Sequence, residues 1–197
     1  EIVKRTRLGT IREKDIDTLI DASLQFEQPS GYELMHSTPI EFKADGKLMR
    51  SSPIGLRANT ISSTISHVYV DSRFKQLIDN ALAVINMQAD MYVGVPLAEG
   101  LFVIPRSDRI MGAVLIDVGY SHTDISLLFN TALIKCTVLE VGGMHFTNDL
   151  AYGLNLPASV AENVKRRYVY SLDYQDSIDN IRIPGGGTIK LEHRDVQ

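Results

Sequence analysis

Three short apolar stretches between residues 113 and 141 constrain this 197-residue chain more than any other feature. Each stretch is long enough for one strand, and the connections between them are only as long as turns. Strands joined by turns pair as antiparallel neighbours, because a parallel pair needs a crossover of a dozen or more residues. The sequence therefore predicts a three-stranded meander with strands at residues 113–118, 124–129 and 132–141.

Helical patterns surround this meander and predict a mixed α/β domain over residues 71–197. One helix is expected to start at Asp71 or Ser72, which can cap it. The other elements expected here are a short strand at Met91–Val93, helices at 96–104, 147–154 and 159–168, and a flexible linker at Pro184–Thr188.

Residues 1–70 carry a second pattern and are expected to form a separate small α+β domain. One helix covering one face of a few strands is about the smallest unit that can bury a core. The expected elements are a strand at 2–8, a helix opened by the capping pair Thr10 and Glu13, a strand at 32–42, a turn at Asp45-Gly46 and a strand at 60–70.

Composition excludes several classes of protein. Lys and Arg number 20 against 24 Asp and Glu, a net charge of −4 that argues against a nucleic-acid partner. The one cysteine, Cys136, permits no intrachain disulfide and fits a reducing cytosol. No apolar run approaches the roughly 20 residues of a membrane span. The ends at Glu1 and Gln197 suggest a fragment of a longer protein.

The turn between the first two meander strands combines residue types suited to phosphate and metal. Asp117 ends an apolar strand, where its carboxylate can hold Mg²⁺ through water, and Gly119 opens a tight turn that can aim backbone N–H groups at an anion. Alternatively, Asp117 and Gly119 serve only the turn, which is the better interpretation of this motif alone.

A second signal follows the third strand. Gly142 and Gly143 precede a helix, so that another group can approach the backbone closely near a helix N-terminus, which attracts anions. The plain alternative is a strand-to-helix turn with Thr147 as the helix cap. The two signals together, in this order and at this spacing, are more specific than either one.

Together the two motifs resemble the second phosphate-binding hairpin of the actin-like ATPase superfamily. Within it the chain most resembles the FtsA family of bacterial cell-division proteins. Residues 52–56 are similar to that family's Pro-x-Gly-Leu element, and residues 144–152 and 157–166 to its helix pair, with Glu162 and Lys165 in matching places. The resemblance implies a partial actin-like (ribonuclease H-like) lobe plus an inserted strand–helix–strand–strand domain.

The resemblance also implies ATP and Mg²⁺ as cofactors and assigns the residues that would bind them. The family pattern Asp-x-Gly-Gly-Gly-Thr-x-Asp departs here at Tyr120, Ser121 and His122, which predicts weak binding or an altered pose. Asp124 is expected to be structural. The assigned positions are Asp117 for the metal, Asp117, Gly119, Ser121, His122 and Thr123 for the phosphates, and Gly142 and Gly143 near ribose or phosphate.

The role implied is that of a cell-division adaptor, at most a slow ATPase. Such proteins bind ATP between two lobes, self-associate into filaments, bind the tubulin-like protein FtsZ and recruit other division proteins. They are cytoplasmic and peripheral on the inner face of the membrane at the division site, held by a C-terminal helix absent from this chain. The alternatives are an ATP-hydrolysing chaperone or kinase of the same superfamily, and a scaffold that has lost nucleotide, for which Tyr120 and His122 are the evidence.

Overall fold

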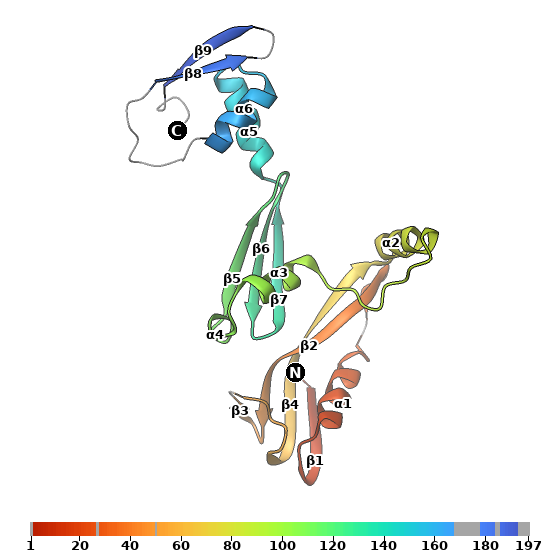
Figure 1. Cartoon of the computed structure of the whole chain (residues 1–197). Helices are drawn as coiled ribbons and strands as arrows, with labels where there is room; N and C mark the ends of the chain where they lie inside the picture. The colour runs from red at the N-terminus through yellow and green to blue at the C-terminus, as the bar shows by residue number, and fades with distance from the viewer. Residues whose placement is uncertain (1, 27, 50, 168–177, 184–185, 193–197) are drawn as a thin grey trace. The chain divides into compact units, whose positions relative to one another are not determined.

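A computed structural model describes residues 2–26, 28–49, 51–167, 178–183 and 186–192 (Figure 1). Contacts divide the chain into two compact units, Glu1–Leu115 with Ile125–Thr137, and Ile116–Asp124 with Val138–Gln197. These units do not follow the predicted domain boundary at residue 70, which stays a prediction. No helix in the described ranges is long and apolar enough to cross a membrane.

The first unit contains a four-stranded sheet in the order β1-β4-β2-β3, with every neighbouring pair antiparallel. Its elements follow the chain as strand, helix, strand, strand, strand, so the predicted order gains one short strand, β3. The bounds are β1 Ile2–Thr10, α1 Glu13–Ser23, β2 Tyr32–Ala44, β3 Lys47–Met49 and β4 Arg57–Asp71.

Helix α1 buries one side against this sheet. Leu19 of α1 packs with Ile11, Ala58 and Ile61 in one buried cluster, which removes their apolar surface from water. The predicted capping pair is wrong: Thr10 is the last residue of β1, and the backbone N–H of Arg12 donates to the Asp15 carboxylate over 2.9 Å.

The turn between β2 and β3 confirms the predicted Asp-Gly signal. Asp45 and Gly46 have φ of 46° and 77°, the two left-handed residues of a tight hairpin turn. The partners of β2 in β3 reach only from Phe42 to Ala44. Pro39 therefore lies where β3 does not extend, and a proline without an N–H is tolerated there.

Three helices follow β4: α2 (Ser72–Val84), α3 (Val95–Val103) and the short α4 (Arg106–Arg109). Asp71 caps α2, since its carboxylate accepts from the backbone N–H groups of Arg73 and Phe74. The predicted strand at Met91–Val93 is wrong, because these residues have no ladder partner among the described residues. Instead the Tyr92 hydroxyl donates to the Asp79 carboxylate of α2.

The predicted meander is confirmed. Strands β5 (Ala113–Val118), β6 (Thr123–Phe129) and β7 (Ala132–Leu139) form a three-stranded sheet in the order β5-β6-β7. Connections of four and two residues join them, at 119–122 and 130–131. The four-residue connection is the turn that the sequence singled out.

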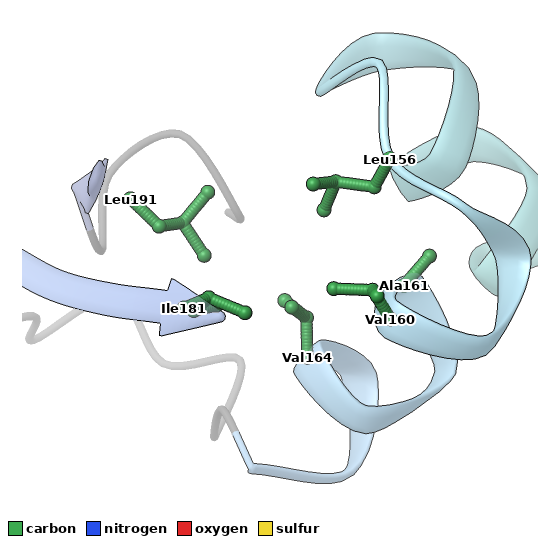
Figure 2. Packing of buried hydrophobic residues seen from close by; sticks show 6 residues of the cluster. All are labelled: Leu156, Val160, Ala161, Val164, Ile181 and Leu191. Atoms are coloured by element: carbon green, nitrogen blue, oxygen red, sulfur yellow. The ribbon is translucent and has the colours of Figure 1, made fainter. Parts of the chain in front are cut away.

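The second unit places two helices against a hairpin, α5 (Gly143–Gly153) and α6 (Ala158–Arg167) against β8 (Ile178–Ile183) and β9 (Gly187–Glu192). Figure 2 shows their shared core, formed by Leu156, Val160, Ala161, Val164, Ile181 and Leu191.

The sequence did not predict this hairpin. Gly187 and Thr188 begin β9, so the flexible-linker interpretation is wrong for them, while residues 184–185 lie outside the described residues. The expected end of α6 at Tyr168 also lies outside them. Helix α5 begins at Gly143, so the alternative interpretation in which Thr147 caps it is wrong.

Candidate functional site

The turn between β5 and β6 is closed by one backbone bond. The N–H of Gly119 donates to the carbonyl of His122 over 2.9 Å, which leaves Tyr120 and Ser121 at the corner. In the described part of the chain, no acceptor takes a hydrogen bond from the N–H of either corner residue. The corner thus offers two free backbone donors, as an anion-binding turn requires.

The same turn caps helix α5. The first N–H groups of a helix have no partner within it. Here the N–H of Gly143 donates to Gly119 O over 2.9 Å, and that of Met144 donates to Tyr120 O over 2.7 Å. The hairpin and the start of α5 are therefore one hydrogen-bonded assembly within the second unit.

Gly142 makes this close approach possible. A Cβ added to Gly142 would lie 2.7 Å from the Gly119 oxygen, the Tyr120 oxygen and the His122 nitrogen, distances that real side chains do not tolerate. The close approach that the paired glycines predict is present, and the approaching group is the hairpin backbone. The predicted place of Gly142 and Gly143 near ribose or phosphate stays a prediction.

Side chains around the turn bind one another. The Thr123 hydroxyl donates to Val141 O over 2.6 Å, which ties β6 to the segment before α5. Ser121 Oγ and His122 Nδ1 share a hydrogen bond of 2.9 Å, and His122 Nε2 lies 3.6 Å from Asp124 Oδ2. The exposed imidazole therefore lies between a hydroxyl and a carboxylate at the mouth of the turn.

Asp117 is half-buried near the end of β5, two residues before the turn. The described residues contain no group of three or more His, Cys, Asp or Glu side chains that could hold a metal. Magnesium, however, is often bound by one or two carboxylates, with water and the substrate's phosphates completing its shell. The assignment of Asp117 to a metal stays a prediction.

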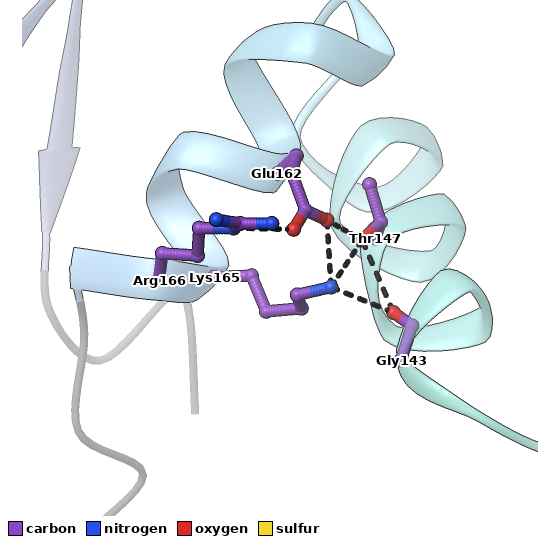
Figure 3. Close-up of polar contacts among 5 residues, drawn as sticks. All are labelled: Gly143, Thr147, Glu162, Lys165 and Arg166. Carbon is purple, nitrogen blue, oxygen red and sulfur yellow. Dashed lines mark hydrogen bonds and ion pairs between the residues drawn. The ribbon is translucent and has the colours of Figure 1, made fainter. Parts of the chain in front are cut away.

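A polar cluster lies between α5 and α6 and was not assigned from the sequence as part of the site (Figure 3). The ammonium group of Lys165 donates to Gly143 O over 3.0 Å and to Thr147 Oγ1 over 2.9 Å, and lies 2.6 Å from Glu162 Oε2. Hydrogen bonds from Lys165, then Thr147 and Arg166, lower the pKa of Glu162 to about 2. The i,i+3 and i,i+4 spacing of Glu162 with two cations was the available sequence signal.

Two family models match the chain in succession. One describes an SHS2 domain inserted in FtsA and matches residues 1–69, and the other describes cell division protein FtsA and matches residues 114–196. The chain belongs to the FtsA family. Its fold is a partial actin-like lobe with a small inserted α+β domain, as predicted.

Individual proteins similar to this chain are also FtsA proteins. Cell division protein FtsA of Neisseria meningitidis is 26% identical over 94% of this chain and 45% of its own length. The FtsA protein of Pseudomonas aeruginosa is 24% identical over 88% of this chain and 42% of its own length. The chain therefore spans less than half the length of these FtsA proteins.

A solved structure shares the fold. MreB5 of Spiroplasma citri bound to AMPPNP superimposes with a TM-score of 0.50 at 17% identity, over 64% of this chain and 42% of that one. At this identity the likeness concerns the fold alone.

Proposed function

We propose that this chain is part of a bacterial cell-division adaptor that binds ATP and links FtsZ to the membrane. The observation that carries the proposal is the order of the two family matches, an inserted SHS2 domain at residues 1–69 followed by an FtsA lobe at 114–196. The domain matched at residues 1–69 is described as an insertion in FtsA, which disfavours the enzyme alternative.

The β5–β6 turn is the proposed phosphate site. The free N–H groups of Tyr120 and Ser121, with the Ser121 hydroxyl, supply donors for phosphate oxygens, and Gly119, His122 and Thr123 shape the turn. When bound, Mg²⁺ would neutralise part of the phosphate charge, and Asp117 is the residue proposed to hold it.

Gly142 and Gly143 support this site. Both hold the start of α5 against the turn, close to where ribose or phosphate is proposed to lie. These contacts would hold the corner donors in place for the proposed anion.

The nucleotide proposal is tested on the full-length gene product by titration calorimetry with Mg-ATP. Saturable binding that is weakened in Asp117→Ala supports it. Absence of binding by folded protein favours the second candidate function, a scaffold of the same fold without nucleotide. One observation favours that candidate: the first N–H groups of α5 are already occupied by hairpin carbonyls rather than open to an anion.

The adaptor role adds partners beyond this chain. FtsZ, other division proteins and further copies in a filament are the proposed partners, and the proposed location is the cytoplasmic face of the membrane at the division site. The β2 edge from Tyr32 to Pro39, which has no β3 partner in the described residues, is the proposed contact of the inserted domain.

Co-sedimentation with FtsZ polymers tests the adaptor role. The full-length protein is expected in the pellet only when FtsZ is polymerised. Folded protein that stays in the supernatant contradicts the adaptor role. Rapid ATP turnover in the same preparation would instead support an ATP-hydrolysing enzyme.

A further inference from the structure

Thr147 occupies a buried position on α5, one turn after Gly143. The residue is 6% exposed, so its side chain faces neighbouring protein atoms and not solvent. Its hydroxyl oxygen lies 2.5 Å from Glu162 Oε2, 2.9 Å from Lys165 Nζ and 3.1 Å from Gly143 O (Figure 3). One hydroxyl thus contacts three other groups of the cluster.

The number of hydrogen-bonding protons on each group determines which group donates and which accepts. A threonine hydroxyl carries one proton, and the shorter contact assigns it to the Glu162 carboxylate. Lys165 has three donors, and three acceptors surround it: Gly143 O, Thr147 Oγ1 and Glu162 Oε2. Each N–H donor of the ammonium group therefore has an acceptor, and the Thr147 hydroxyl is one of the three acceptors that orient the group.

The cluster reaches the turn through Gly143. Its carbonyl accepts from Lys165, and its N–H donates to the carbonyl of Gly119 in the β5–β6 turn. These contacts run without a gap from Glu162 on α6 to the turn. A shift of Lys165 would move the first turn of α5, and with it the hydrogen bonds that hold the hairpin.

We propose that Thr147 is a positioning residue for the phosphate hairpin, whose hydroxyl orients Lys165 and so fixes Gly143 and the turn at residues 119–122. The residue does not touch nucleotide. The inference rests on the proposed function, because a positioned phosphate hairpin matters only if phosphate binds.

The first test measures the hairpin without nucleotide. Hydrogen exchange of the full-length protein, followed by mass spectrometry, reports the amides of Gly143 and Met144. Thr147→Val keeps the size of the side chain and removes its hydroxyl, and should raise their exchange by about tenfold, as expected for one buried hydrogen-bonding group. Thr147→Ser restores the hydroxyl and should restore slow exchange.

The matched control is Thr18→Val on α1. The Thr18 hydroxyl lies 2.7 Å from the carbonyl oxygen four residues before it, Lys14 O, as the Thr147 hydroxyl lies near Gly143 O, but Thr18 is on an exposed helix face. Exchange at Gly143 and Met144 should be unchanged in this variant. If Thr147→Val fails to fold by circular dichroism, Thr147→Cys replaces it, because a thiol is a weak hydrogen-bonding group.

The second test measures affinity for Mg-ATP by calorimetry in the same variants. Thr147→Val should bind about tenfold more weakly, with Thr147→Ser and Thr18→Val close to the original protein. Equal affinity and equal exchange in Thr147→Val would overturn the positioning role. If the original protein binds no ATP, the proposed nucleotide function fails, and faster exchange in Thr147→Val still shows the link from Thr147 to the hairpin.

Discussion

Gly142 and Gly153 lie at the two ends of α5 and meet different surroundings. An alanine at 142 would place its Cβ 2.7 Å from three backbone atoms of the hairpin turn, whereas one at 153 meets no atom within 4 Å. We expect Gly142→Ala to lower the free energy of unfolding by about 1–3 kcal/mol, because backbone atoms cannot move aside cheaply.

Urea unfolding of both variants checks this expectation. Gly153→Ala should change the free energy of unfolding by less than about 1 kcal/mol, in the stabilising direction, since alanine favours a helix over glycine. Equal stability of the two variants would contradict the close contact between hairpin and helix.

Glu162 should make the second unit sensitive to acid. Its pKa falls from 4.5 to about 2 in the folded chain, first through Lys165 and then through Thr147 and Arg166. A carboxyl with a lowered pKa stabilises the fold above its unfolded pKa, and this contribution is lost as pH falls through the folded pKa. The loss should therefore lie between about pH 5 and pH 2.

The measurement compares unfolding at pH 6 and pH 2.5 for the original chain and Glu162→Gln. The original chain should lose more stability on acidification than the variant, which has no carboxyl there to protonate. Glu140→Gln, at an exposed position of the same unit, should follow the original chain. If Glu162→Gln and the original chain lose the same stability between pH 6 and pH 2.5, Glu162 does not cause the acid sensitivity.

At the scale of elements, the β2–β3 turn holds part of the first sheet together. Asp45 Oδ1 accepts from the backbone N–H groups of Asn59 and Thr60 over 2.9 and 2.8 Å, so the turn is joined to β4 as well as to its own strands. Asp45 also takes a left-handed φ of 46°, which few residue types adopt readily.

Asp45→Ala should therefore destabilise the first sheet by about 1–3 kcal/mol, because it removes the acceptor of three hydrogen bonds, two from backbone N–H groups and one from the Thr60 hydroxyl, and places a less suitable residue at this φ. Asp45→Asn is the matched control, since it keeps an oxygen acceptor and tolerates this φ. Hydrogen exchange at Asn59 and Thr60 reports the effect locally. Unchanged protection in Asp45→Ala would show that β2 and β4 hold the turn without these bonds.

At the scale of the whole molecule, one face of β5 presents apolar side chains to solvent. Val114, Ile116 and Val118 alternate along the strand and are 58%, 60% and 61% exposed. Contiguous apolar surface of this kind promotes association and binds hydrophobic dyes.

Replacing all three residues with threonine should lower dye fluorescence and raise the solubility of the 197-residue chain. Threonine keeps the β-branched shape that suits a strand, so the circular dichroism spectrum should not change. Unchanged dye binding with an unchanged spectrum would place the association surface elsewhere.

The sequence by itself determined the elements that have long, regular apolar patterns. Strands β4 to β7 and helix α2 were predicted because alternation, an apolar run or helical spacing persists over several residues. The Asp45-Gly46 turn and the close approach at Gly142 were predictable too, since both depend on local backbone chemistry. The FtsA resemblance rested instead on motifs, the turn that follows Asp117 and the paired glycines before α5.

Tertiary structure alone decided the features that depend on distant partners. Strand β3 has three residues and exists because β2 pairs with it, and β8 and β9 are strands because their apolar residues pack on α6. Thr147 looked like a helix cap from its neighbours, but Glu162 and Lys165 bring it into a buried cluster. A residue's burial and hydrogen-bond partners come from segments far along the chain, and local periodicity carries no information about them.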